Sequence, residues 1–253
     1  MKYRIRYAKM QLILYQTGMS KINILFFETI DSTNTYARKN AQSLDLPALI
    51  IANEQSAGRG RRGNSFYSPC NTGLYMTLVF EEPECTELLT PAAAVAVCRA
   101  LERKNTEPKI KWVNDIFVNQ KKVCGILTER FSVGNRSIIA VGIGINLTTA
   151  DFPSELSVAG AVNIECDKKV LALEISDLFF DEMNSKYIVD EYRKRLFILG
   201  NKITFMRNGK MISAVATDIN QSCNLIVKHS DGRIETLSSG EISIDMRCYY
   251  QQN

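Results

Sequence analysis

The chain has 253 residues, of which 45% are hydrophobic and 23% charged, a composition typical of a folded globular protein and not of a disordered chain. Its net charge of +4 is too small to identify a nucleic-acid-binding protein from charge alone. No apolar run approaches the roughly 20 residues that span a bilayer, and no cleavable leader is recognisable, so we expect no membrane association and a cytoplasmic location.

Apolar runs and helical spacing alternate along the first 198 residues. Residues 1–20 form an N-terminal extension without a clear period. Helices are predicted from the N-cap residues at 31–35 through Asn40, after Pro91 over 92–104, and twice between 168 and 196. Together with the strands given next, these helices indicate an α+β or α/β sheet protein. Strands are predicted at residues 22–27, 49–52, 73–80, 109–113, 116–118, 122–129 and 137–145, with a hairpin turn at 119–121.

The pattern changes at about Gly200, where short strands separated by turn residues replace the longer elements. Their spacing fits a small β-barrel. We therefore expect a main domain at residues 21–198 and a small C-terminal β-barrel domain at residues 199–253. The five strands of this second domain are predicted at residues 202–206, 212–217, 224–229, 233–237 and 242–246.

A loop rich in glycine and arginine follows the strand at 49–52. Residues 54–67 read Glu-Gln-Ser-Ala-Gly-Arg-Gly-Arg-Arg-Gly-Asn-Ser-Phe-Tyr. Glycine allows positive φ and a close approach of the backbone to a ligand, and arginine offers a permanently charged fork for carboxylate or phosphate. A loop of this kind directly after a strand indicates an anion-binding site. The alternative is a flexible basic loop that contacts nucleic acid non-specifically.

Cysteine and histidine provide no signal for a metal site or a nucleophile. The seven cysteines are an odd number with wide gaps and no C-x-x-C pair, which argues against a zinc site and a disulfide framework. A Ser-His-Asp or Cys-His arrangement would depend on the only histidine, His229, which lies in a strand-like run. Cations, amides and carboxylates are the remaining candidates for the chemistry.

Short polar motifs recur in a fixed order along the chain, and together they resemble the biotin–protein ligase family. Each motif alone is weakly specific, but five in this order are highly specific. The resemblance covers roughly residues 24–246, since Gly240-Glu241-Ile242-Ser243 also resembles the family's C-terminal signature. The five motifs are Asp-Ser-Thr-Asn at 31–34, Gln-x-x-Gly-Arg-Gly-Arg-Arg-Gly at 55–63, Lys-Trp-x-Asn-Asp at 111–115, Lys-x-x-Gly-Ile-Leu at 122–127 and Gly-x-Gly-Ile-Asn at 142–146.

The resemblance implies a fold and a reaction. The fold is α+β, a mixed sheet flanked by helices like that of class II aminoacyl-tRNA synthetases and biotin synthetases, followed by a small β-barrel of the Src-homology-3 type. In the reaction, biotin and ATP with Mg²⁺ give biotinyl-5′-adenylate and pyrophosphate. A lysine of a biotin carboxyl carrier domain, part of a biotin-dependent carboxylase, then takes the biotinyl group. No covalent enzyme intermediate is implied.

Matching motif positions assign the biotin-binding roles to named residues. Gly125 and Gly142 would give backbone contact and room for the ligand. Gly58, Arg59 and Arg61 would line the biotin carboxylate and the adenylate phosphate, and the loop would close over them to exclude water. The ureido ring of biotin would be bound by the polar residues Ser32, Thr33 and Gln55, with Asn34 in the same motif.

The nucleotide roles fall on the remaining cations, amides and one aromatic residue. Arg62 would assist with the phosphates, and Lys122 would neutralise charge at the α-phosphate. Asn114 and Asp115 would hold the nucleotide, with Asp115 as the ligand of Mg²⁺. The adenine would be contacted by Asn146 and stacked on Phe66. The residues expected to act in catalysis are Lys122, Arg61, Arg59 and Asp115.

Four residues depart from the family pattern. Val113 stands where proline is usual, Cys124 where alanine or serine is, Asn64 where a basic residue is frequent, and Phe66 where a tryptophan can stack on adenine. None of them removes a charge that the reaction requires. Phe66 could stack with its smaller ring, and Cys124 is expected to be a small buried hydrophobic residue.

Other functions compete with this interpretation. A lipoate–protein ligase performs the same adenylation on a different acid, although its arginine–glycine loop differs from residues 58–63. A repressor would carry a winged helix, for which the residues before Ile22 are too few, so we expect no sequence-specific DNA binding. Non-enzymatic nucleic-acid binding through Arg59 to Arg62 stays open. We expect a monomer or a weak homodimer.

Overall fold

The computed structural model describes residues 22–240 and 242–244. The N-terminal extension expected at residues 1–20 lies outside the described residues. So do Glu241 of the C-terminal signature and the last two positions of the strand predicted at 242–246. Within the described ranges, no helix is both long enough and apolar enough to cross a membrane.

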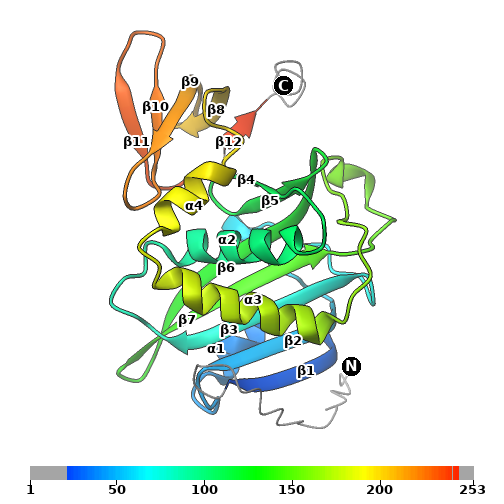
Figure 1. Cartoon of the computed structure of the whole chain (residues 1–253). Helices are drawn as coiled ribbons and strands as arrows, with labels where there is room; N and C mark the ends of the chain where they lie inside the picture. Colours follow the sequence, from blue (N-terminus) through cyan, green and yellow to red (C-terminus); the bar gives the residue numbers. More distant parts are fainter. Residues whose placement is uncertain (1–21, 241, 245–253) are drawn as a thin grey trace.

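A seven-stranded sheet forms the larger part of the molecule (Figure 1). The first two strands of the sheet pair in parallel, and all the other neighbours are antiparallel, so the sheet is mixed as predicted. The strand order is β1-β2-β3-β7-β6-β5-β4. The strands are β1 (Asn23–Ile30), β2 (Ala48–Gln55), β3 (Gly73–Glu81), β4 (Lys109–Lys111), β5 (Asp115–Val118), β6 (Lys121–Val133) and β7 (Arg136–Asn146).

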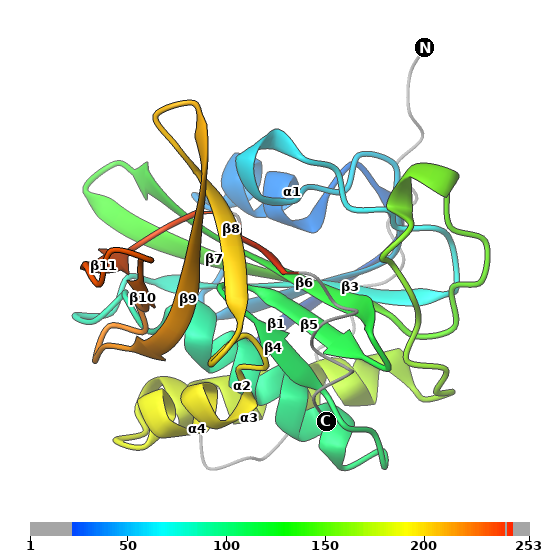
Figure 2. The same cartoon turned by 90° about the horizontal axis from the view of Figure 1, so that it is seen from above.

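Helices cover both faces of this sheet (Figure 2). Helix α1 (Thr33–Asn40) lies on one face, and α2 (Leu89–Glu102), α3 (Lys168–Met183) and α4 (Ile188–Arg195) lie on the other. Strand β2 shows the consequence, because its Leu49 and Ile51 join the core under α2 and α3 while Ile50 joins the core under α1. Burial on both faces explains why the central strands are continuous apolar runs.

Five antiparallel strands form a second, smaller sheet in the order β11-β10-β9-β8-β12. The indole Nε1 of Trp112 donates to the carbonyl of Cys223 at 2.9 Å, which ties this sheet to the turn after β4. An antiparallel C-terminal sheet of five strands agrees with the prediction. The strands are β8 (Lys202–Arg207), β9 (Lys210–Ile219), β10 (Leu225–Lys228), β11 (Ile234–Leu237) and β12 (Ile242–Ile244).

Local chemistry explains several element boundaries. Ser32 is the N-cap of α1, and its hydroxyl accepts from the Thr35 N–H. Asn119 and Gln120 both have positive φ, which is the geometry of a two-residue hairpin turn between β5 and β6. The strand predicted at 109–113 ends at Lys111, because the following residues turn to bury the Trp112 side chain. Two single-turn 3₁₀ helices, Arg61–Gly63 and Ser154–Leu156, lie in loops.

Candidate active site

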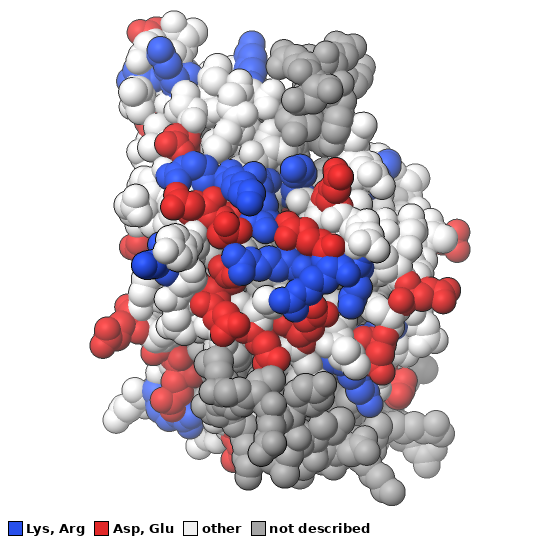
Figure 3. All heavy atoms as spheres, in the orientation of Figure 1, with Lys and Arg blue, Asp and Glu red and all other residues white. Residues whose placement is uncertain are grey.

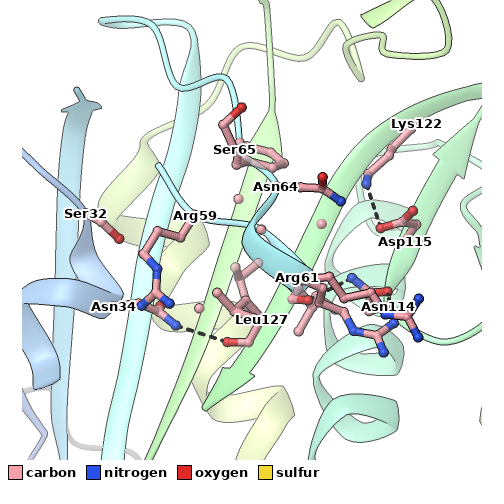
Figure 4. Close-up of a pocket in the computed structure, with 18 of the residues that line it drawn as sticks. Ser32, Asn34, Arg59, Arg61, Asn64, Ser65, Asn114, Asp115, Lys122 and Leu127 are labelled. Atoms are coloured by element: carbon pink, nitrogen blue, oxygen red, sulfur yellow. Dashed lines mark hydrogen bonds and ion pairs between the residues drawn. The ribbon is translucent and has the colours of Figure 1, made fainter. Parts of the chain in front are cut away.

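The five sequence motifs converge on one pocket on the face of the large sheet that carries α1 (Figure 4). Strands β1 and β2 are parallel, so the residues that follow Ile30 and those that follow Gln55 leave the sheet side by side. The other motifs lie across the sheet on β7, β6 and β5. The residues that line the pocket include Ser32, Thr33, Asn34, Gln55, Arg59, Arg61, Arg62, Asn64, Phe66, Lys111, Asn114, Asp115, Lys122, Gly125, Gly142 and Gly144.

Short side chains form a hydrogen-bonded corner at one end of the pocket. Gln55 Oε1 accepts from the Thr33 N–H at 2.8 Å and from the Thr33 hydroxyl at 3.1 Å. The other side of the Gln55 amide donates to Ser68 Oγ at 3.0 Å. The buried Thr77 hydroxyl lies 2.8 Å from Thr33 Oγ1 and donates to Asn34 Oδ1 at 2.7 Å. These bonds fix the amide and hydroxyl groups that face the pocket.

Glycines leave bare backbone on the sheet beneath this corner. A Cβ on Gly142 would lie 2.1 Å from Asn34 Oδ1, so the Asn34 side chain occupies the space that any other residue would need. Gly125 and Gly144 face each other across β6 and β7. The Phe66 ring lies on both, and a Cβ on Gly144 would come within 2.5 Å of it. Phe66 therefore closes the far end of the loop against the sheet.

The arginine–glycine loop folds back over the pocket, held by its own backbone and by two of its arginines. The Gly60 N–H donates to the Asn64 carbonyl at 2.7 Å, and the Phe66 N–H donates to the Gly58 carbonyl at 2.9 Å. Arg59 Nη1 lies 3.1 Å from the Glu129 carboxylate. Arg61 Nη1 donates to Asn114 Oδ1 at 3.0 Å and to the Gly240 carbonyl at 3.4 Å (Figure 4).

Lys122 and Asp115 form an ion pair at the other end of the pocket, with 2.7 Å between Nζ and Oδ1 (Figure 4). The two residues come from the adjacent strands β5 and β6. The backbone of Lys122 is fixed as well, because its N–H donates to the Val158 carbonyl and its carbonyl accepts from the Gly160 N–H. Nearby, burial raises the pKa of the Cys124 thiol well above its usual value, so this cysteine stays protonated.

The structure brings together most of the residues predicted from the motifs, with two exceptions. Gly58 does not line the pocket, because it packs inside the loop, where a Cβ would lie 2.4 Å from the Phe66 carbonyl oxygen. Asn146 also lies outside the lining, at the end of β7, where its Nδ2 donates to the Gly160 carbonyl at 3.1 Å. Sequence reasoning missed Glu129. The alternation of β6 was the available signal, since it places Glu129 on the same face as Gly125.

On the face that carries α2, α3 and α4, basic and acidic side chains alternate and form no single positive area (Figure 3). Ion pairs account for this pattern, among them Arg99–Glu182, Arg103–Glu174 and Arg195–Glu102. A phosphate backbone needs a continuous basic surface, so this face does not fit nucleic-acid binding.

The basic loop and Lys122 converge on a pocket lined by small polar groups. This arrangement is typical of the class of proteins that bind small carboxylate and phosphate ligands. Two family models match the chain. The Biotin/lipoate A/B protein ligase family matches residues 26–146, and the Biotin protein ligase C terminal domain matches residues 198–245. The chain belongs to the biotin/lipoate A/B protein ligase family and carries the C-terminal domain of biotin protein ligases.

Individual relatives are similar over different shares of the chain. The bifunctional ligase/repressor BirA of Bacillus spizizenii is 36% identical over 143 residues, which cover 53% of this chain and 44% of that relative. The biotin protein ligase from Aquifex aeolicus in complex with biotin and ATP superposes with a TM-score of 0.73 at 24% identity, covering 88% and 98% of the two chains. The biotin protein ligase from Leishmania major in complex with biotinyl-5-AMP gives a TM-score of 0.59 at 28% identity, and the match covers 86% of this chain and 99% of that one.

Proposed function

We propose that the protein is a biotin–protein ligase, which activates biotin with ATP to biotinyl-5′-adenylate and transfers the biotinyl group to a lysine of a biotin carboxyl carrier domain. One observation carries the proposal: a hydrogen-bonding corner around Thr33 and Gln55 and a cationic end around Lys122 face the same pocket. Biotin has a polar ureido ring at one end and a carboxylate at the other, so a single molecule would use both ends.

In the first step, a carboxylate oxygen of biotin attacks the α-phosphorus of ATP, and pyrophosphate leaves. Attacking and attacked groups are both negatively charged, so the protein must hold two anions together and offset their repulsion. Arg59, Arg61 and Lys122 line the pocket and supply positive charge for this purpose. In the second step, the amine of the carrier lysine attacks the activated carbonyl carbon, and AMP leaves with the bonding electron pair.

The adenine site is supported by one buried atom. Within the described residues, Asn146 Oδ1 is buried and has no hydrogen-bond partner, whereas its Nδ2 is held by Gly160. A buried acceptor without a donor costs about 1–3 kcal/mol. The exocyclic amine of adenine is a donor of the required kind; to reach Asn146 Oδ1, which lies outside the pocket lining, adenine would have to open the packing around this atom.

Mg²⁺ would be held largely by the nucleotide. No group of three acidic, histidine or cysteine side chains that could hold a metal occurs in the part of the chain described, and the Asp115 carboxylate is paired with Lys122. Protein sites for Mg²⁺ in nucleotide enzymes use one or two carboxylates plus phosphate oxygens and waters. One carboxylate fits this pattern, with Asp115 as the protein ligand, and the ion would offset phosphate charge.

Detection of the intermediate tests the proposal. Purified protein is incubated with ATP and Mg²⁺ and with either biotin or lipoic acid, and the products are identified by mass spectrometry. We expect biotinyl-adenylate, and labelling of a carrier domain when one is added. Lipoyl-adenylate without biotinyl-adenylate would favour the lipoate–protein ligase alternative instead. Tight, salt-resistant binding to a single DNA sequence would contradict the expected lack of DNA recognition.

A further inference from the structure

Glu129 is an acidic residue on the pocket face of β6 that the motifs leave without a role. Its side chain is only 12% exposed. Three donors from two other parts of the chain converge on its carboxylate: Asn34 Nδ2 at 3.0 Å, Arg38 Nη2 at 2.9 Å and Arg59 Nη1 at 3.1 Å. Asn34 and Arg38 belong to α1, and Arg59 belongs to the arginine–glycine loop. Glu129 thus joins α1 and the loop to the sheet.

A carboxylate that is this poorly exposed needs several charge-assisted donors, since desolvation strongly disfavours an unpaired charge. The carboxylate therefore restrains the donors that stabilise it. Arg59 is 43% exposed and lies on a loop of 3 glycines in 6 residues, so its side chain would otherwise have many conformations. Nη1 of its guanidinium contacts Glu129, and Arg59 also lines the pocket. A planar guanidinium held at one nitrogen has fewer accessible orientations and keeps its other N–H groups available to a ligand.

We propose that Glu129 is a positioning residue that holds Arg59, and through Arg59 the loop from Gly58 to Phe66, over the pocket. Arg38 shares the charge of the same carboxylate, so Arg59 keeps positive charge for an anionic ligand. The identity of that ligand, the biotinyl-adenylate, rests on the proposed function. The positioning of the loop does not, because the contacts that support it are all made between residues of the chain.

Hydrogen exchange of the ligand-free protein tests the positioning directly. In Glu129→Gln, which keeps the shape but removes the charge, we expect loop amides such as Gly60 and Phe66 to exchange about tenfold faster, equivalent to about 1.4 kcal/mol. Arg38→Ala is the matched control, since it removes an exposed partner of the same carboxylate outside the pocket, and the loop should then exchange as in the unchanged protein. Peptides from β3 and β7 report whether the fold is intact.

A double-mutant cycle separates positioning from general stability. In an Arg59→Ala background, Glu129→Gln should add no further increase in loop exchange, because the side chain that Glu129 holds is already absent. An undiminished effect in that background, or equal loop exchange after Arg38→Ala and Glu129→Gln, would overturn the proposal. So would unchanged loop exchange in Glu129→Gln.

A second measurement links the positioning to the ligand. Release of biotinyl-adenylate from Glu129→Gln should be about tenfold faster than from the unchanged protein, again without a further effect in the Arg59→Ala background. If the unchanged protein forms no biotinyl-adenylate, the proposed function fails, while the exchange experiment still decides the role of Glu129. If the adenylate forms and Glu129→Gln retains it normally, the link to the ligand is wrong.

Discussion

Replacing Gly144 by alanine tests whether the packing of the Phe66 ring against Gly125 and Gly144 keeps the loop closed. An added Cβ would lie 2.5 Å from Phe66 Cε1 and 2.8 Å from Cζ, much closer than carbon atoms can approach. The obstructing group is the side chain of a loop residue, and the strand backbone is fixed by its ladder with β3 and β6. We therefore expect the strand to stay in place and the Phe66 ring to leave it.

The magnitude follows from what the ring buries. Complete burial of a phenylalanine side chain stabilises by about 1.5–3 kcal/mol, and Phe66 is only half-buried. Its edge-to-face contact with Tyr75, at 6.4 Å between ring centroids, adds roughly 0.5–1.5 kcal/mol. Loss of the packing of Phe66 against the sheet should then weaken loop closure by about 1–2 kcal/mol. This corresponds to a roughly five- to thirtyfold faster release of biotinyl-adenylate.

The assay measures the rate at which preformed biotinyl-adenylate leaves the protein after rapid removal of free ligand. Phe66→Ala should accelerate release by a similar factor, and Gly144→Ala should have little further effect in that background. An effect of Gly144→Ala that is as large without the Phe66 ring as with it would refute the reasoning, because the added methyl group would then be acting on the sheet or the ligand itself.

Three further outcomes are expected. Lys122→Ala should slow adenylate formation on the order of 100-fold while biotin binding changes little, since its charge matters most in the transition state; single-turnover rates and calorimetry check this. Gly142→Ala should destabilise the protein by about 1–3 kcal/mol in denaturant unfolding, less so when Asn34 is also alanine, because its Cβ collides with that side chain. Iodoacetamide at pH 8 should alkylate exposed Cys70 well before Cys124, whose raised pKa and burial suppress the thiolate, as mapped by mass spectrometry.

Much of the fold was predictable because the strands of the large sheet are buried on one or both faces. Strand β2, buried on both sides, is an uninterrupted apolar run that could be located from the sequence. Strand β4 was predicted two residues too long, since the apolar Trp112 and Val113 continue its pattern although the chain turns there. The order of the seven strands could not be read locally, because pairs such as β3 with β7 join segments far apart in the sequence.

The site was predictable where short motifs recur in order and unpredictable where a single distant residue completes it. Thr33 and Gln55 were expected together, and they are hydrogen-bonded. Arg59 and Glu129 are 70 positions apart in the chain, and the sequence around neither residue indicates that they are in contact. Matching motif positions assigned Gly58 to the ligand; in the structure its missing Cβ makes room for the Phe66 carbonyl within the loop.

The contacts of the loop connect ligand binding to the position of the small sheet. Arg61 reaches both Asn114, beside β5, and the Gly240 carbonyl, just before β12. The Trp112 indole, in the same turn as Asn114, donates to the carbonyl of Cys223 in the turn between β9 and β10. Arg61 already lines the pocket, so a ligand that binds its guanidinium in place of Asn114 or Gly240 changes its contacts beside β5 or before β12. Coupling free energies are reciprocal. If ligand binding changes the equilibrium between two positions of the small sheet by a given factor, the ligand's affinities for those two positions differ by the same factor.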